Sequence, residues 1–176
     1  FRTIAENASD LIAMLEVDGT RVYNNPAYRQ VFGDSPPAQD GDSFAEIHPD
    51  DRERIRAIFD KTVATGYGER TEFRFLLPDG SVRHIESEGS VIRDARGRVS
   101  KVVVVSRDIT QRMQAQRRIS DQLHFLTQLV DAIPTPVFYK DVAGKYLGCN
   151  RAFEEVLGRP REKIIGRGIE ELFPPQ

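Results

Sequence analysis

The sequence feature that most constrains the fold is an internal repeat. The segment "NPAYRQVFG" at 25–33 recurs as "NRAFEEVLG" at 150–158, and Gly19 recurs as Gly144. One offset of 125 residues, without a gap, aligns the chain from about residue 4 to residue 51 with its C-terminal part. This offset is much longer than the roughly 20–50-residue periods of solenoids, so the pattern predicts two related domains.

The second copy has no counterpart of residues 52–108, because the 176-residue chain stops soon after the matching stretch. The sequence therefore predicts a complete first domain at 1–109, a linker at 110–133 and the N-terminal half of a second domain at 134–176. An unpaired strand edge and an uncovered apolar surface should leave 134–176 loosely held, unless a neighbouring molecule covers them. We expect a piece of a longer protein, since the first residue is Phe and not Met.

Hydrophobic patterning predicts an α+β fold for the first copy. Apolar runs on either side of Asp18-Gly19 and of Asp79-Gly80 predict two β-hairpins, because both dipeptides accept positive φ. Between them, apolar residues at helical spacing predict short helices, of which the longest ends at Gly66. Unbroken valines at 102–105 predict a last strand that is buried on both faces or central in the sheet. This order predicts a five-stranded antiparallel sheet with the helices on one face.

Local chemistry gives more detailed predictions. Asn25 should be the N-cap of a short helix with Pro26 at its first position, and Asp50 or Asp51 should cap the longest helix. A two-residue turn at Asp79-Gly80 would set the pairing of the strands beside it. It would pair Leu77 with Val82, Phe75 with His84 and Phe73 with Glu86, which puts His84 and Glu86 on the inner face of the sheet.

Residues 110–133 contain no Gly or Pro, which predicts one long helix with the Thr110 hydroxyl as its cap. Its apolar residues follow the 4-3-4-3 spacing of a coiled-coil seam: Ile119, Leu123, Leu126, Val130 and Ile133. An amphipathic helix that packs on its own domain would show a similar stripe. We favour a dimeric coiled coil, and hence a homodimer, because a helix between two domains extends away from both cores.

Composition and missing motifs exclude several classes of function. The net charge of −2 gives no field that would draw the chain to nucleic acid or to an anionic membrane, and no apolar run is long enough to span a bilayer. The single cysteine, Cys149, excludes an internal disulfide and fits a reducing cytoplasm. The sequence shows no phosphate-binding loop, nucleophile elbow or zinc motif, so we expect no enzymatic activity from this segment.

Several motifs, in this order, resemble those of PAS domains with a C-terminal PAC motif in bacterial signalling proteins. The first copy contains "NPAYRQVFG", "IHPDDRERI", "EFRFLLPDGSVRHIES" and the closing "SRDIT". The second copy contains "FYKDVAGKYLGCNRAFEEVLG" and "IIGRGIEELFP", which match the N-terminal half of a PAS domain. The chain departs from the family pattern at His84, where Trp is usual, and at Val104, where Gly is frequent.

The resemblance implies a PAS fold with strands in the spatial order 2-1-5-4-3 over a small cavity. It also implies a sensory segment of a multidomain protein, with an effector such as a histidine kinase or a diguanylate cyclase in the same chain. Asp108, Ile109 and Thr110 match the motif that joins the sensory sheet to the output helix in this family. A shift of the last strand would there become a tilt or rotation of the helix.

The resemblance also raises the question of a cofactor. Haem-binding PAS domains use a His on the long helix, but residues 50–66 contain none and His48 precedes them. Light-sensing flavin domains carry Cys in "NCRFLQ", whereas Cys149 lies in "GCNRAF". His48, His84 and His124 are too scattered for a metal site. We therefore expect neither haem, nor that flavin, nor a metal ion.

A small organic ligand stays open. The residues that could line its pocket are Met14, Ile58, Phe59, Phe73, Phe75 and His84; equally, such residues could simply fill the core. Two functions follow. The first is a ligand sensor that dimerises and relays a signal through the linker helix. The alternative is a ligand-blind dimerisation and relay module, or the sensor part of a transcriptional regulator.

Overall fold

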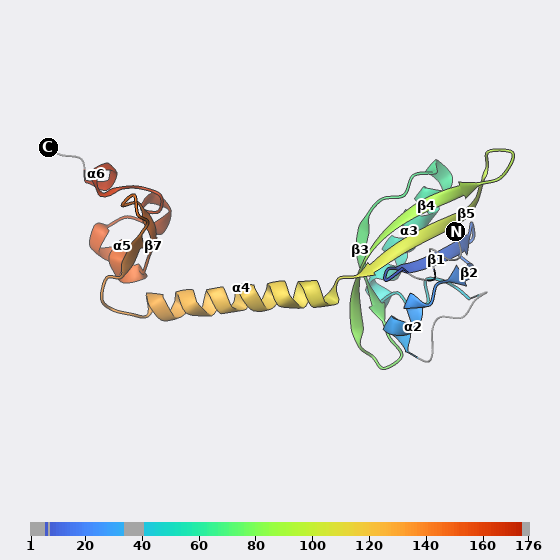
Figure 1. Cartoon of the computed structure of the whole chain (residues 1–176), viewed down its shortest axis with the longest axis horizontal. Helices are drawn as coiled ribbons and strands as arrows, with labels where there is room; N and C mark the ends of the chain where they lie inside the picture. The colour runs from blue at the N-terminus through green and yellow to red at the C-terminus, as the bar shows by residue number, and fades with distance from the viewer. Residues whose placement is uncertain (1–5, 7, 34–40, 174–176) are drawn as a thin grey trace. The chain divides into compact units, whose positions relative to one another are not determined.

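The computed structural model describes residues 6, 8–33 and 41–173, which form two compact units (Figure 1). Unit 1 is Phe1–Gln114 and unit 2 is Ala115–Gln176. Within the described residues, no helix is both long and apolar enough to cross a membrane.

Unit 1 contains one five-stranded antiparallel sheet in the order β2-β1-β5-β4-β3. The strands are β1 Leu11–Glu16, β2 Arg21–Asn24, β3 Thr71–Leu76, β4 Val82–Arg93 and β5 Val99–Asp108. β5 therefore has the central position that its run of valines predicted. It is not buried on both faces, because Val102 is buried whereas Val105 is 41% exposed. Both the predicted α+β class and the predicted strand order are confirmed.

Two helices of unit 1 follow the N-terminal hairpin: α2 Ala27–Phe32 and α3 Pro49–Thr65. α3 crosses one face of the sheet (Figure 1) and ends at Gly66, whose φ of 80° places it in the left-handed region. Its N-cap is His48 and not an aspartate, because the helix already starts at Pro49. The imidazole Nδ1 of His48 accepts a hydrogen bond from the Asp50 N–H at 3.3 Å.

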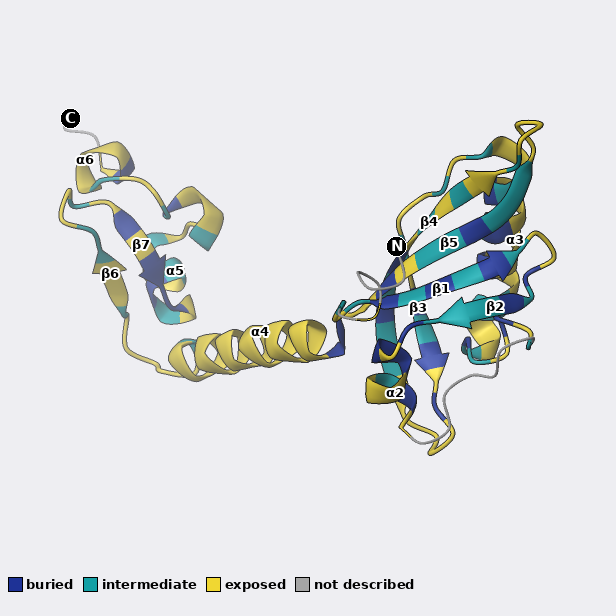
Figure 2. Cartoon of the chain, turned by 45° about the vertical axis from the view of Figure 1, so that its right-hand side comes forward, coloured by how far each residue is buried: buried dark blue, intermediate teal, exposed yellow. Residues whose placement is uncertain are grey.

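The core of unit 1 lies between α3 and the inner face of the sheet, where buried and half-buried residues alternate along the strands (Figure 2). Leu11, Ala13 and Leu15 of β1 point inward, as period-two alternation requires. Aromatic rings line the space between α3 and the sheet. Phe44 meets Phe59 edge-on, with ring centroids 5.4 Å apart.

The β3–β4 hairpin differs from the predicted pairing by one residue. The Leu77 N–H donates to the Ser81 carbonyl, the Gly80 N–H donates back to Leu77, and Gly80 has a φ of 81°. These bonds define a three-residue loop with a left-handed glycine at its end, where a two-residue turn was predicted.

The changed loop reverses the faces of β4. Phe73 pairs with Ile85 and Arg74 pairs with His84, one residue away from the predicted pairing. A shift of one residue turns every side chain of a strand to the other face of the sheet. Ile85 is completely buried in the core. His84 and Glu86 thus lie on the outer face, contrary to the sequence prediction.

Unit 2 repeats the start of unit 1. One continuous helix, α4, covers Thr110–Asp131 and so begins in unit 1 and continues into unit 2. Behind it come β6 Phe138–Lys140, β7 Tyr146–Cys149, α5 Arg151–Leu157, a 3-10 turn at Arg161–Lys163 and α6 Ile169–Leu172. The core of unit 2 consists of Tyr146, Cys149, Phe153, Ile164 and Leu172, with Leu157 against it.

The two copies differ in the residue at the N-cap of the helix that follows the first hairpin. In unit 2, Asn150 is the N-cap of α5 and its Oδ1 accepts from the Phe153 N–H at 3.0 Å. In unit 1, the N-cap of α2 is Pro26, which forms no side-chain cap, so the prediction for Asn25 is wrong. Asn25 still serves β1: its Oδ1 accepts from the Ile12 N–H at 3.0 Å.

Candidate functional site

A cavity of about 80 Å³ lies between the sheet of unit 1 and α3. Four of the predicted pocket residues line it: Ile58, Phe59, Phe73 and Phe75. Its other apolar walls come from the alternating inward positions of β1 and β5, such as Leu15 and Val102.

Met14 and His84, also predicted for the pocket, do not line this cavity. Met14 lies between the inward-facing Ala13 and Leu15 and so points to the opposite face of β1. His84 is turned outward by the register of the β3–β4 hairpin. Apolar residues occupy both faces of β1, and so the alternation of the sequence could not decide which face is inside.

Two charged residues, Arg21 and Glu69, line the cavity, and the sequence analysis identified neither. Arg21 of β2 is 2% exposed, and its guanidinium donates to both carboxylate oxygens of Glu46, at 3.1 and 3.0 Å. Its Nε is buried with no partner among the described residues. Burial raises the pKa of the neighbouring Tyr28 to about 12, so its phenol stays neutral. The Arg21–Glu46 pair neutralises the charge of Arg21 beside an apolar cavity.

The size and polarity of the cavity limit its occupant. Pockets for drug-sized organic ligands occupy about 300–1,000 Å³, whereas one water takes about 30 Å³. The hydroxyls of Ser87 and Ser106 bond to each other, and the Thr62 hydroxyl donates to the Ile58 carbonyl. A cavity of this size therefore has room for a few waters or a very small molecule. Whether it binds a ligand stays a prediction.

The predicted relay residues Asp108, Ile109 and Thr110 lie where β5 ends and α4 begins. The Thr110 hydroxyl accepts from the His84 N–H at 2.8 Å, and the Ile109 N–H donates to the His84 carbonyl at 2.9 Å. Asp108 Oδ1 accepts from the Thr110 N–H at 2.8 Å. Ile109 and Thr110 are both buried. The first turn of α4 is thus hydrogen-bonded to the neighbouring strand, β4.

This geometry differs in one respect from the sequence prediction. The Thr110 hydroxyl was expected to cap its own helix, but it bonds across to β4, and the cap oxygen comes from Asp108. An ion pair adds a second tie on the outer face: Arg112 of α4 lies 3.7 Å from Glu86 of β4. His84 thus contributes to this junction through its backbone.

Nearly all of α4 is exposed (Figure 2), and its exposed residues include a broad stripe of large apolar side chains. The five residues of the predicted seam, Ile119, Leu123, Leu126, Val130 and Ile133, are between 39% and 60% exposed. Phe125 and Leu129, which the seam does not include, are similarly exposed and widen the stripe. A contiguous exposed apolar surface of this kind is typical of a contact with another protein.

Part of this stripe also faces its own unit. Leu123, Leu126 and Val130 line a groove of about 320 Å³ in unit 2, together with Tyr139 of β6 and Leu147 of β7. The open alternative for α4, packing on its own domain, is therefore partly realised at its C-terminal end. Because these residues remain 39% to 60% exposed, the groove does not cover them.

Among the described residues, no group of three or more His, Cys, Asp or Glu side chains could hold a metal ion. Cys149 is a buried free thiol whose pKa is raised, mainly by burial and also by the nearby Glu154. A thiol of raised pKa is a weak nucleophile, so its environment is that of a core residue.

Known proteins resemble this chain in sequence. The virulence sensor protein BvgS of Bordetella pertussis is 36% identical over 73 residues, 42% of this chain. The two-component sensor PprA of Pseudomonas aeruginosa is 29% identical over 71% of this chain. The probable diguanylate cyclase DgcE of Escherichia coli is 24% identical over 68% of it. The chain spans 6% to 13% of the length of these relatives.

A solved structure and two family models also resemble this chain. The crystal structure of a PAS domain from Colwellia psychrerythraea superposes with a TM-score of 0.57 at 23% identity, covering 62% of this chain and 93% of that one. A family model described as PAS fold matches residues 5–114, and a second, also described as PAS fold, matches residues 124–176. The chain therefore belongs to the PAS family, with two PAS copies in tandem, which confirms the resemblance found in its sequence.

Proposed function

We propose that this chain is the sensory and relay segment of a multidomain bacterial signal-transduction protein in the cytoplasm. Its relatives include two proteins named as sensors and one named as a probable diguanylate cyclase. An effector domain in the same polypeptide, a histidine kinase or a diguanylate cyclase, would carry the enzymatic activity. The segment itself would supply sensing, dimerisation and transmission.

One observation carries this proposal: the start of α4 is hydrogen-bonded to β4. The backbone of His84 bonds to both Ile109 and Thr110, so β4, the end of β5 and the first turn of α4 are tied together. A shift of β4 against β5 must therefore displace the start of the helix. A change in the sheet becomes a tilt or rotation of α4.

Dimerisation is proposed from the exposed stripe of α4. The predicted seam places Ile119 and Leu126 at core positions of a parallel two-stranded coiled coil, where each would meet its copy in the partner. A paired α4 would bury surface that the described structure leaves open to water. It would also give the two copies of an effector a defined spacing.

Sedimentation of the full 176-residue chain tests dimerisation. We expect the wild type to be a dimer at micromolar concentration. The double variant Ile119→Lys, Leu126→Lys should be a monomer, since like charges would meet across the seam, while lysine keeps the helix. The matched control is Gln114→Lys, Asp121→Lys, at two exposed positions off the seam. A monomeric wild type would rule out the proposed dimer, as would a seam variant that still dimerises.

The ligand-blind relay module is the second candidate function, and the small, largely satisfied cavity favours it. A metabolite screen by thermal shift separates the two. A ligand present at 100 times its Kd should stabilise unit 1 by about 2.7 kcal/mol. Stabilisation by a small molecule supports the sensor. If no compound raises the melting temperature while the chain dimerises, the relay module is correct.

A further inference from the structure

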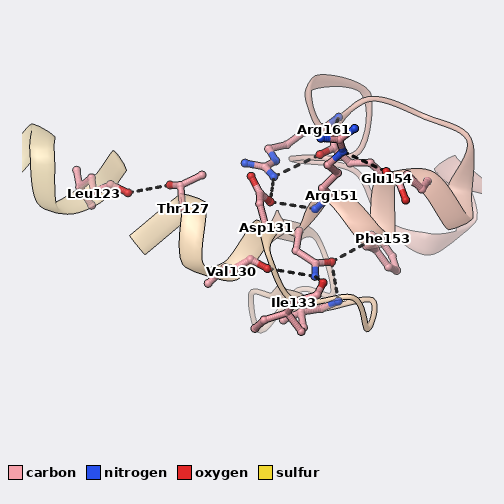
Figure 3. Close-up of polar contacts among 12 residues, drawn as sticks. Leu123, Thr127, Val130, Asp131, Ile133, Arg151, Phe153, Glu154 and Arg161 are labelled. Carbon is pink, nitrogen blue, oxygen red and sulfur yellow. Dashed lines mark hydrogen bonds and ion pairs between the residues drawn. The ribbon is translucent and has the colours of Figure 1, made fainter. Parts of the chain in front are cut away.

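The last turn of α4 meets the start of α5 in a cluster of polar side chains (Figure 3). Four residues of unit 2 form it: Asp131 at the end of α4, Asn150 and Arg151 at the start of α5, and Arg161 of the 3-10 turn. Asn150 is 0% exposed, whereas the side chains of Asp131 and Arg161 are 29% and 30% exposed. The cluster thus has a buried part and a part that water reaches.

Asn150 is the buried residue of this cluster, and its side-chain amide bonds to several backbone groups. Its Nδ2 donates to the carbonyls of Val130, Ile133 and Thr135 at 3.3, 3.0 and 2.9 Å. Its Oδ1 accepts from the Val137 N–H at 2.8 Å and from the Phe153 N–H at 3.0 Å. One side chain therefore satisfies carbonyls at the end of α4 and donors at the starts of β6 and α5. Because both its oxygen and its nitrogen are hydrogen-bonded, the side chain of Asn150 is held in one position.

Asp131 belongs to the part of the cluster that water reaches, and its charge favours contact between α4 and α5. A carboxylate at the C-terminal end of its own helix is unfavourable, because that end carries partial negative charge. At the N-terminal end of α5 the same carboxylate is favourable, and it accepts from the Arg151 N–H at 2.9 Å. It also accepts from Arg161 Nη2 at 2.6 Å. Asp131 is therefore stabilised only while α5 lies against α4.

Arg161 does not depend on Asp131 alone. Its Nη2 also lies 3.3 Å from Glu154, and Glu154 accepts from the Arg161 N–H at 2.6 Å. Burial alone would lower the pKa of Arg161, but the hydrogen bond that it donates to Asp131 and the charges of Asp131 and Glu154 outweigh burial and raise it. Loss of the Asp131 contact would leave Arg161 charged and paired. This part of the cluster can open without leaving an unpaired cation.

The first copy cannot form the same contact. At the offset of 125 residues, Arg151 corresponds to Pro26 and Arg161 to Pro36. Proline has no N–H, and so the first copy lacks the backbone donor that Arg151 provides in the second copy. The contact is thus specific to the helix that joins the two copies, while the asparagine is common to both.

We propose that Asp131, Arg151 and Arg161 form a latch through which movement of α4 reaches the second PAS copy. With the latch closed, the last turn of α4 and α5 move as one body. With it open, α4 pivots about Asn150. The latch rests on the proposed function, in which α4 is the moving element, and it adds a second regulated joint at the far end of that helix.

Amide-resolved hydrogen exchange of the full chain by NMR tests the latch. In Asp131→Ala, we expect exchange at the Arg151 N–H and in the last turn of α4 to be about five- to thirty-fold faster. Exchange at Val137 and in the core around Ile164 and Leu172 should stay at its wild-type rate. Asp131→Asn keeps an acceptor but loses the charge, so its exchange should lie between those of the wild type and the alanine variant.

Two controls make the result specific. Asp121→Ala, at an exposed position of the same helix, should change neither region. In 1 M NaCl, where the Debye length is about 3 Å, exchange at Arg151 should accelerate in the wild type and not in Asp131→Ala. Unchanged protection at Arg151 in Asp131→Ala overturns the latch. So does a loss of protection throughout unit 2, because Asp131 would then hold the fold itself.

Different results would disprove the proposed latch and the proposed dimer. Sedimentation of the same samples reports the oligomeric state independently of exchange at Arg151. A monomeric wild type with an intact Asp131 effect disproves the dimeric relay and leaves the latch standing. A dimer without the Asp131 effect leaves the relay standing and disproves the latch.

Discussion

Equivalent buried asparagines hold the start of each PAS copy. The Asn25 Nδ2 donates to the Asp10 carbonyl at 2.9 Å, and the Asn150 Nδ2 donates to the Thr135 carbonyl, also at 2.9 Å. The Oδ1 of each accepts from a backbone N–H at the start of its own copy, that of Ile12 in β1 and that of Val137 just before β6. Both side chains are almost completely buried, so replacing either would leave several main-chain groups unpaired.

An ion pair at the start of α3 gives a pH-dependent contribution to stability. The Arg74 side chain and backbone N–H both donate to Asp51, at 2.8 and 3.0 Å. These hydrogen bonds, the side-chain one first, hold the pKa of Asp51 below its ordinary value. A carboxyl with a lowered folded-state pKa stabilises the fold above the unfolded pKa and loses that contribution as the pH falls through the folded one.

We therefore expect Asp51→Asn to destabilise unit 1 at pH 7 and to matter progressively less below about pH 4. Urea unfolding of the wild type and of the variant between pH 7 and pH 2.5 measures the difference. Asp60→Asn, at an exposed position of the same helix, is the control and should show no such trend. A gap between Asp51→Asn and the wild type that is constant with pH would refute the assignment.

At the scale of elements, one hydroxyl among the contacts at the junction between β5 and α4 bonds to the neighbouring strand β4. Thr110→Val keeps the shape of the side chain and removes the acceptor for the His84 N–H. We expect this variant to lose about 1 kcal/mol of stability and to exchange the His84 amide faster. Hydrogen exchange and urea unfolding measure the two effects.

The matched control for Thr110→Val lies in the same helix. The Thr127 hydroxyl donates to the Leu123 carbonyl within α4 and is exposed. Thr127→Val should therefore leave the His84 amide and the stability of unit 1 unchanged. Equal effects of both valine variants would show that helix propensity, and not the bond to β4, is responsible.

Elements with a strong local signal were predictable from the sequence. The first hairpin around Asp18-Gly19, the central position of β5 and the end of α3 at Gly66 all followed from local residues. The register of the β3–β4 hairpin was not predictable, because Asp79-Gly80 suits a two-residue turn and equally a three-residue loop that ends in a left-handed glycine. That one-residue difference moved His84 from the predicted pocket to the outer face.

Site residues that depend on contacts with residues far away in the sequence could not be predicted either. Arg21 lies in a strand whose other positions are half-buried, and only its contact with Glu46 explains an arginine in the interior. Asp131 and Arg161 are 30 residues apart, so neither suggested the other. The seam of α4 followed from heptad spacing, but the width of the stripe depends on Phe125 and Leu129, which that spacing omits.

On the scale of the whole molecule, the two units have cores of very different size. Among the described residues, the core cluster of unit 1 contains fourteen buried residues from both sides of the sheet–helix interface. That of unit 2 contains five. Because burial of apolar surface is the main favourable term in folding, unit 2 should be the less stable of the two.

We therefore expect two unfolding transitions in urea, with unit 2 unfolding first. Variants of the equivalent asparagines can assign each transition to a unit. Removing a buried, hydrogen-bonded amide lowers the free energy of unfolding by about 1–3 kcal/mol for each group left unsatisfied. Asn150→Ala should lower the midpoint of the first transition and Asn25→Ala that of the second, each without moving the other. NMR peak intensities of the two units along the titration distinguish them. A single transition that both variants shift equally would mean that the two units fold as one, and that α4 joins them into a common cooperative structure.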